Sequence, residues 1–285
     1  MHRRLLLVIL LFYPLILTSC ADGGPVGDRL QISVTFYPLQ YVAERIADNN
    51  ADVINITPAA ADPHSLELSP KQVKAMGEAD LIVHLSGGFQ PAVDQALAVI
   101  GDVPKTDTAM LADGREGDPH FWLDPARLAK AGELVAQGMS EIDPANSALY
   151  MLHAQELTKE LQELESEISL GLKDCQGATL VTSHEAFGYF ADKYGLQQVG
   201  INGIDPAQEA SPARLRTIAK TVAEQDVQTL FFEVAASDKM TRVLATDLNV
   251  NVAVLHSIER ASENDDYLDL MHQNLDALES GLNCG

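Results

Sequence analysis

Residues 143–174 read DPANSALYMLHAQELTKELQELESEISLGLKD, and this stretch decides the fold that the sequence predicts. It has no proline after Pro144, and its one glycine, Gly171, lies near its end. Apolar residues recur every three to five positions, as on one face of a helix: Leu149, Leu152, Leu157, Leu161, Leu164 and Ile168. At about 1.5 Å per residue, such a helix would reach roughly 45 Å. A coiled coil is one interpretation, but a single isolated helix favours a backbone that joins two lobes.

Apolar runs alternate with helical patterns on both sides of this helix. Before it, we expect strands at 30–36, 51–57 and 80–86, and helices at 38–49, 69–79 and 91–101. After it, we expect strands at 178–183, 196–201, 227–234 and 250–257, and helices at 186–195, 212–224, 238–247 and 265–281. Such alternation predicts a parallel sheet covered by helices. The predicted fold class is α/β, with two lobes, each a mostly parallel sheet flanked by helices, joined by one long rigid backbone helix.

The N-terminus, MHRRLLLVILLFYPLILTSC, has the order of a secretory signal: a basic start, an apolar run and small residues at the end. The run is too short for a spanning helix, which needs roughly 20 apolar residues. Its LTSC ending is similar to a bacterial lipoprotein signal, in which the cysteine carries the lipid. We therefore predict an exported protein, anchored through Cys20 in the periplasm or at the cell surface; plain secretion is the alternative. The predicted domains are a signal peptide at 1–19, a flexible tether at 20–29, an N-terminal lobe at 30–142, the linking helix at 143–174 and a C-terminal lobe at 175–285.

The chain is strongly acidic, with 41 Asp and Glu against 19 Lys and Arg, and a net charge of −22. Phosphate groups would repel such a surface, which argues against nucleic acid or an anionic membrane surface as a partner. The remaining cysteines, Cys175 and Cys284, are an even pair in an exported chain and can form a disulfide. Cys284 lies at the C-terminal end, where a bridge would hold the last helix in place. The sequence does not show whether the two meet.

Three histidines follow apolar runs where predicted strands give way to loops. His64 lies in ADPHSLELSP, His120 in GDPHFWLDP and His184 in LVTSHEAFG. Ligands of open parallel sheets gather at the carboxyl ends of strands. His64 and His120 belong to the first predicted lobe and His184 to the second, so the sequence predicts one shared metal site in the cleft between the lobes.

Together with DPANSALY, SPARLRTIAK and YLDLMHQNLDAL, these motifs carry a resemblance that covers about residues 30–282. In this order they resemble the zinc/manganese solute-binding lipoproteins of bacterial ABC importers, known as cluster A-I. The resemblance implies capture of a divalent transition metal outside the cytoplasmic membrane and its delivery to a membrane permease. It also implies a monomer that is not an enzyme.

The resemblance assigns the metal to His64, His120, His184 and a fourth group. The segment VLHSIERASEN has SIE where a zinc subgroup of the family has PIE, which favours Glu259 as the fourth ligand. His256 is the rival, and a site without a fourth protein ligand is the third alternative. Three imidazoles with one carboxylate suit zinc better than manganese, which prefers more oxygen donors. Zinc is therefore the expected ligand, and manganese is the alternative.

A ligating imidazole usually donates its other ring N–H to a carboxylate or a carbonyl. Six carboxylates near the motifs are candidates for that role: Asp62, Glu67, Asp118, Asp124, Glu185 and Glu233. Of the other histidines, we expect His84 to be packed within a strand or to support a ligand, and we expect His153 and His272 on helix surfaces.

Catalytic zinc sites also use three protein ligands, so a zinc hydrolase is the enzyme alternative. HEAFG at 184–188 begins like a zinc-protease motif, but Gly188 stands where the second histidine should be. Glu185 remains a candidate base. An adhesin that merely holds a structural zinc is a third function class.

Overall fold

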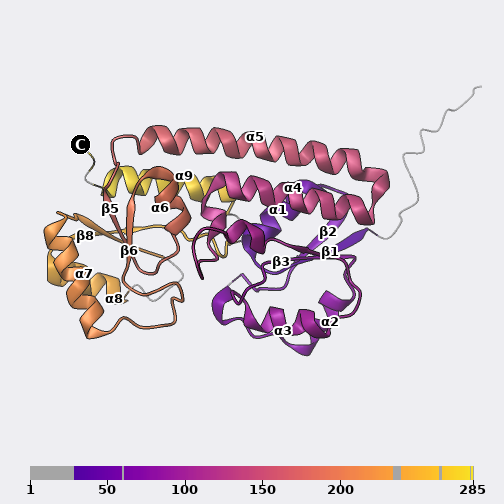
Figure 1. Ribbon diagram of the computed structural model, residues 1–285, viewed down its shortest axis with the longest axis horizontal. Coiled ribbons are helices and arrows are strands. Elements are labelled where there is room, and N and C mark those ends of the chain that lie inside the picture. The colour runs from indigo at the N-terminus through magenta and orange to yellow at the C-terminus, as the bar shows by residue number, and fades with distance from the viewer. Residues whose placement is uncertain (1–28, 60, 234–238, 263–264, 283, 285) are drawn as a thin grey trace, which may run out of the picture.

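The computed structural model describes residues 29–59, 61–233, 239–262, 265–282 and 284, which form two lobes beneath one long helix (Figure 1). The predicted signal peptide and Cys20 lie outside the described residues. No described helix has the length and apolar character needed to cross a membrane. The predicted α/β class with two parallel sheets flanked by helices is confirmed.

The first lobe is a four-stranded parallel sheet in the order β2-β1-β3-β4. Its strands are β1 (Leu30–Val34), β2 (Ala51–Asn55), β3 (Leu81–His84) and β4 (Lys105–Asp107). Its helices are α1 (Tyr37–Ala47), α2 (Pro70–Gly77), α3 (Pro91–Val99) and α4 (Pro125–Ile142). The sequence prediction did not include β4 or α4. β4 is short and polar, whereas α4 buries Leu128, Val135 and Met139 at helical spacing, so its signal was present in the sequence.

The second lobe repeats this arrangement, with a parallel sheet in the order β6-β5-β7-β8. Its strands are β5 (Thr179–Thr182), β6 (Gln197–Gly200), β7 (Thr229–Phe232) and β8 (Asn251–Val254). Its helices are α6 (Gly188–Tyr194), α7 (Pro212–Glu224), α8 (Lys239–Leu248) and α9 (Tyr267–Gly281). The loops that carry the histidine motifs come from both lobes, and they meet between them.

The long helix α5 (Ser147–Gly171) has 25 residues, or about 37 Å at 1.5 Å per residue. It follows a 3₁₀ turn, Pro144–Asn146, and runs back along α4 as a helical hairpin (Figure 1). The predicted apolar stripe was wrong at its start, because Leu152 is 48% exposed and Leu149 is only half-buried. The buried positions alternate at four and three residues, which keeps them on one face: Tyr150, Ala154, Leu157, Leu161, Leu164 and Ile168.

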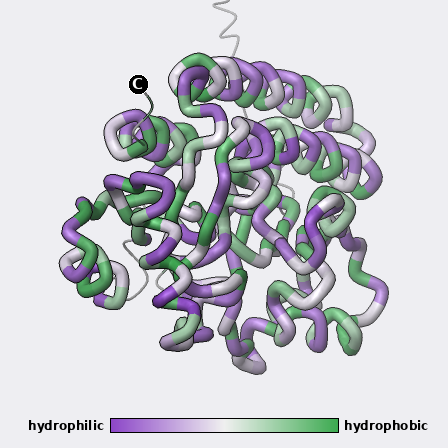
Figure 2. Tube along the Cα trace, turned by 60° about the vertical axis from the view of Figure 1, so that its left-hand side comes forward, coloured by the Kyte–Doolittle hydropathy of each residue, from purple (hydrophilic) through white to green (hydrophobic). Residues whose placement is uncertain are grey.

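α5 is packed along its length and is attached to both lobes. It contacts α4 and α1 in the first lobe and α9 in the second. An Arg45–Glu160 ion pair, 2.7 Å between nitrogen and oxygen, ties it to α1, and His272 of α9 pairs with Glu167 at 2.8 Å. One continuous apolar core extends from Ile32 in β1 to Leu282 after α9. Along α4 and α5, hydrophobic and hydrophilic residues alternate (Figure 2), as expected of helices that pack on one face.

Cys175 and Cys284 are bonded to each other in the structure, with Cα atoms 4.7 Å apart. Cys175 lies just after α5, and Cys284 lies just beyond the end of α9. The bridge therefore joins the start of the second lobe to its last helix.

Candidate metal centre

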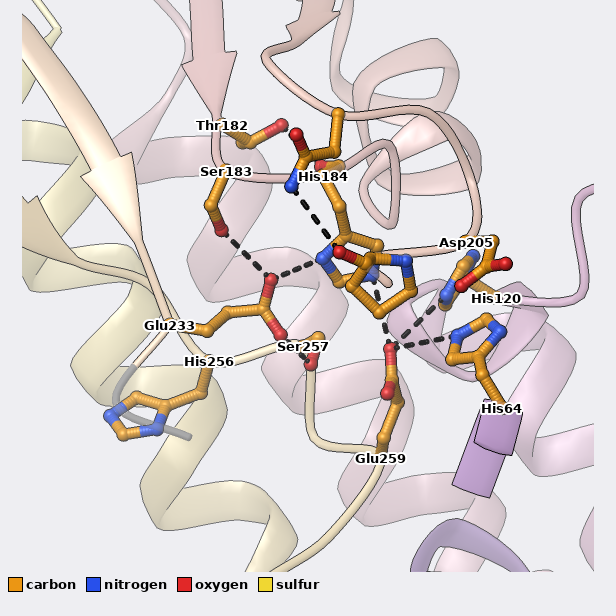
Figure 3. A network of polar contacts seen from close by, with 12 residues as sticks. His64, His120, Thr182, Ser183, His184, Asp205, Glu233, His256, Ser257 and Glu259 are labelled. Atoms are coloured by element: carbon orange, nitrogen blue, oxygen red, sulfur yellow. Dashed lines mark hydrogen bonds and ion pairs between the residues drawn. The ribbon is translucent and has the colours of Figure 1, made fainter. Parts of the chain in front are cut away.

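The four predicted ligands lie on four different strand-end segments. His64 is in the 3₁₀ turn Pro63–Ser65 after β2, and His120 directly precedes the turn Phe121–Leu123. His184 follows β5, and Glu259 follows β8. Two of these segments belong to each lobe, so the cluster forms only where the lobes meet (Figure 3).

The repeated Asp-Pro-His pattern builds the same local turn twice. The Asp62 carboxylate accepts the backbone N–H of His64 at 2.9 Å, and the Asp118 carboxylate accepts that of His120 at 3.0 Å. The intervening proline has a fixed φ, so an aspartate two residues before the histidine closes a compact turn. This short-range chemistry explains why the sequence already indicated these two positions.

The donor atoms of His64, His120, His184 and Glu259 all lie within 4.8 Å of one another. Glu259 Oε1 is 3.1 Å from His120 Nε2, 3.2 Å from His184 Nε2 and 3.6 Å from His64 Nε2. Ligand atoms bonded at about 2.0–2.2 Å to a tetrahedral zinc lie about 3.3–3.6 Å apart. The distances from Glu259 Oε1 to the three nitrogens are close to these values, and three nitrogens with one carboxylate oxygen are donors that suit zinc.

Carboxylates orient two of the imidazoles through their second ring nitrogen. His120 Nδ1 is 2.9 Å from Asp118 Oδ1, and His184 Nδ1 contacts Glu233 Oε1. Glu233 also accepts hydrogen bonds from Ser183 at 3.1 Å and from Ser257 at 2.5 Å. Partners of this kind hold the ring in one orientation and present Nε2 to a metal.

Electrostatics couple these groups closely. Burial opposes the protonated form of His120, but its hydrogen bonds to Asp118 and Glu259 outweigh that effect and raise its pKa above 6.5. Burial opposes protonation of His184 as well, yet Glu233 and Glu259 raise its pKa well above 6.5. Burial favours a neutral Glu259, but hydrogen bonds from the histidines hold its pKa well below 4.5. A cation must therefore displace protons from imidazoles to bind here.

Ile258, directly before Glu259, has an unusual backbone conformation. Its φ is 56°, in the left-handed region that β-branched residues rarely adopt, and the side chain is only 2% exposed. Such a conformation persists where the surrounding packing holds it. The next residue, Glu259, points its carboxylate toward the three histidines (Figure 3).

His256, the rival fourth ligand, is not part of this cluster among the described residues. Its ring points away from the three histidines (Figure 3), and its backbone N–H and C=O are bound by the Asn274 side chain at 2.6 and 2.8 Å. Burial lowers the pKa of its imidazole. The Asn274 side chain therefore fastens the loop that carries Glu259 to α9.

The other histidines lie elsewhere. His84 is buried at the end of β3, with Nδ1 3.9 Å from Asp107 Oδ1, in agreement with a packed role. His272 is on the surface as predicted. His153 is half-buried and contacts the Ile46 carbonyl at 2.9 Å, because α5 packs against α1 there.

Two of the six candidate supporting carboxylates, Asp118 and Glu233, contact imidazoles of the predicted ligands. Asp62 caps the His64 turn, and Glu67 is exposed. Asp124 caps α4 through the Ala126 N–H, and Glu185 pairs with Arg214 at 2.9 Å.

Sequence reasoning missed an ion-pair network behind His120. Arg115 donates to Asp118 at 3.0 Å and to Asp192 of α6 at 2.7 Å, which links the His120 turn to the other lobe. Gly188 lies so close to Arg115 and Asp118 that a Cβ there would collide with both side chains. No short-range sequence pattern predicts the contact between Arg115 and Asp192, because the two residues are 77 positions apart.

Comparison with known proteins agrees with this arrangement. A family model described as "Zinc-uptake complex component A periplasmic", ZnuA, matches residues 32–281. The "High-affinity zinc uptake system protein ZnuA" of Bacillus subtilis is 31% identical over 90% of this chain and 88% of its own length. The "Zinc-binding lipoprotein AdcA" of Streptococcus pneumoniae is 28% identical over 97% of this chain, which spans 60% of that relative.

Among solved structures, zinc-bound AdcA of Streptococcus pneumoniae superposes with a TM-score of 0.77. It is 29% identical in sequence, and the match covers 89% of this chain and 57% of that one. Since the family model matches nearly all of the described part of the chain, this protein belongs to the ZnuA family of periplasmic zinc-uptake components.

Proposed function

We propose that this protein binds zinc outside the cytoplasmic membrane, through His64, His120, His184 and Glu259, and delivers it to the permease of an ABC importer. The observation that carries the proposal is the spacing of three imidazole nitrogens and one carboxylate oxygen, all within 4.8 Å. Zinc is favoured over manganese because three of the four donors are nitrogen. The names of the zinc-uptake and zinc-binding relatives support the same metal.

A carrier is favoured over a zinc hydrolase. A catalytic zinc keeps a coordination position open for water, with a general base beside it. Here four protein donor atoms lie within 4.8 Å of one another, and Glu185, the candidate base, is paired with Arg214 at 2.9 Å. The arrangement supports capture without catalysis.

The remaining parts of the proposal concern the setting of the protein. Its signal sequence and its lipoprotein relative support export and a lipid anchor on Cys20. We further propose that the protein acts as a monomer and that the bridge between Cys175 and Cys284 forms on export, as the paired cysteines in the structure support. Thiol labelling of the unfolded, unreduced protein would detect two free thiols if the bridge were absent.

Metal content is the test of the proposed function. The mature chain carrying Cys20→Ser is loaded from an equimolar mixture of zinc, manganese, iron and copper, and the bound metal is measured by mass spectrometry. We expect about one zinc per chain, as a four-ligand site holds, and its loss in His64→Ala and His120→Ala. His272→Ala, an exposed histidine, is the control. Retention of manganese in preference to zinc, or no retained metal, would contradict the proposal.

A further inference from the structure

A groove lies on the surface of the helical hairpin, between α4 and α5. It has a volume of about 670 Å³, within the range of roughly 300–1,000 Å³ that is typical of small-molecule sites. Its described lining comes from the two helices, which run side by side (Figure 1), and from the 3₁₀ turn Ala109–Ala112. None of the four predicted zinc ligands is part of it. We call this surface the α4–α5 groove.

The floor of the α4–α5 groove is apolar. Leu111 and Ala154 are buried there, and Leu134 is half-buried. Two methionines of the same lining are exposed, Met110 at 69% and Met151 at 41%. Exposed apolar side chains that gather at a concave surface are typical of a binding site. Methionine side chains are unbranched and adapt their shape to an apolar partner, so this lining suits a flexible alkyl chain.

Two lysines lie at one end of the groove. α4 and α5 touch at Gly132, where a Cβ would lie 3.1 Å from the side chain of Leu157. The short turn Pro144–Asn146 joins the two helices, so they run antiparallel. Lys130 lies two residues before Gly132, and Lys159 lies two residues after Leu157. Both lysines therefore lie at the same level along the helix pair, and both line the groove.

The other end of the groove carries no charged side chain among its described residues. Met151 lies about 9 Å along α5 from the Leu157 contact, at 1.5 Å per residue. Gln137 is the residue of α4 that lines the groove at this end. The one carboxylate of the described lining, Glu133, is three residues from Lys130. The groove is thus cationic at one end and uncharged at the other.

The charge of this groove contrasts with that of the whole protein. The chain has a net charge of −22, and the described lining of the cavity beside His64 has three carboxylates and neither lysine nor arginine. Lys130 forms no ion pair with a described residue. Lys159 pairs with Glu163 at 3.6 Å, and both side chains are well exposed to solvent. The two lysines therefore attract an anionic group, which the acidic surface elsewhere repels.

We propose that the α4–α5 groove binds a single-chain amphiphile with an anionic head, of which a fatty acid is the simplest example. The carboxylate lies between Lys130 and Lys159, and the alkyl chain extends toward Met151. From Gln162 to Met151 the groove extends about 16 Å along α5 at 1.5 Å per residue, which suits a medium-length chain such as that of dodecanoate. A second copy of the protein is disfavoured in the groove, because two chains of net charge −22 repel each other.

The first test compares two heads on the same alkyl chain. Dodecanoate and dodecyltrimethylammonium, each below the concentration at which it forms micelles, compete with a fluorescent fatty acid for the mature chain carrying Cys20→Ser. We expect one saturable site for dodecanoate and about tenfold weaker binding of the cationic compound, because two exposed ion pairs are lost. Lys130→Gln and Lys159→Gln should each weaken dodecanoate binding by about two- to fivefold. Lys173→Gln, an exposed lysine outside the groove, is the control and should have no effect.

The second test places a charge at the apolar end. Met151→Glu should weaken dodecanoate binding more than about tenfold, because the alkyl chain would then cover a carboxylate. Leu152→Glu is the matched control, since Leu152 follows on the same helix, is 48% exposed and does not line the groove. Both variants should bind zinc as the unchanged protein does, which shows that they are folded.

The outcomes distinguish this site from other occupants and from the zinc centre. Equal binding of the two dodecyl compounds would overturn the anionic head, and normal dodecanoate binding by Met151→Glu would overturn the groove as the site. A dimer in sedimentation that Met151→Glu abolishes would assign the groove to a second copy instead. Binding to phosphatidylglycerol vesicles without binding of monomeric dodecanoate would assign it to a bilayer surface. Each of these results overturns the amphiphile site and leaves the proposed zinc-binding function standing.

Discussion

The two lobes place four parallel strands in the same relative order, yet they hold their histidines in different ways. In the first lobe, Asp118 lies two residues before His120 and binds both its backbone and its ring. In the second lobe, the ring of His184 is held by Glu233, which lies 49 residues later, after β7. One proposed ligand, His120, is thus positioned by its own turn, and the other, His184, by a carboxylate from a neighbouring strand.

This difference affects what each carboxylate supports. Asp118 contacts the ring of His120 and also pairs with Arg115, which in turn pairs with Asp192 of α6. Glu233 serves His184 and also accepts a hydrogen bond from Ser257, two residues before Glu259. In the second lobe one buried carboxylate thus supports the positions of two proposed ligands, His184 and Glu259, so its loss should disturb both.

The largest effect should come from removing a ligand on either side of the comparison. We expect His120→Ala and His184→Ala each to weaken zinc binding more than about 100-fold, beyond the range that loss of a supporting partner gives. Competition with a zinc chelator of known affinity measures the change. Equal losses would show that the lobes contribute alike, whereas a variant that bound zinc normally would remove that histidine from the site.

The supporting carboxylates should give the next largest effect and should separate the lobes. Glu233→Gln and Asp118→Asn are each expected to weaken zinc binding by about 10–100-fold. Glu233→Gln should be the more severe because it also disturbs the Ser257 contact beside Glu259. Ser257→Ala isolates that contribution. A larger loss in Asp118→Asn than in Glu233→Gln would reverse our ranking of the lobes.

Zinc affinity should decrease as the pH is lowered, by about tenfold per pH unit for each proton that the ion displaces. Burial alone would lower the pKa values of His120 and His184, but their carboxylate partners raise both above 6.5. Protons therefore compete with zinc below the raised values, and the loss begins at a higher pH than for ordinary histidines. Titrations at pH 8, 7 and 6 would show it, and a flat affinity from pH 7.5 to 5 would argue against three-histidine ligation.

The smallest effect on zinc should come from the bridge of the second lobe, which the first lobe lacks among its described residues. Cys175 and Cys284 are 109 residues apart in sequence. Replacing both by serine should destabilise the fold by about 2–4 kcal/mol, because the unfolded chain gains conformational entropy when the cross-link is removed. We expect a lower melting temperature with nearly unchanged zinc affinity. A large loss of affinity would mean that α9 and the His256 loop depend on the bridge to keep Glu259 in place.

Short-range patterns determined much of this protein from the sequence alone. Alternating apolar and helical segments predicted both parallel sheets, because periodicity follows directly from strand and helix geometry. The two Asp-Pro-His turns indicated His64 and His120, since proline and an aspartate two residues before the histidine form a turn without outside help.

Only the tertiary structure determines which side chains from distant segments point toward one another. The side chain of Glu259 reaches the histidine cluster, whereas the ring of His256 points away from it (Figure 3), and Ile258 just before Glu259 has a φ of 56° that surrounding packing must hold. The face that α5 buries is set by α1, α4 and α9, so Tyr150 and Ala154 replaced the expected leucines. The ion pair from Arg115 to Asp192 joins residues that share no local pattern, because it exists only where the two lobes pack together.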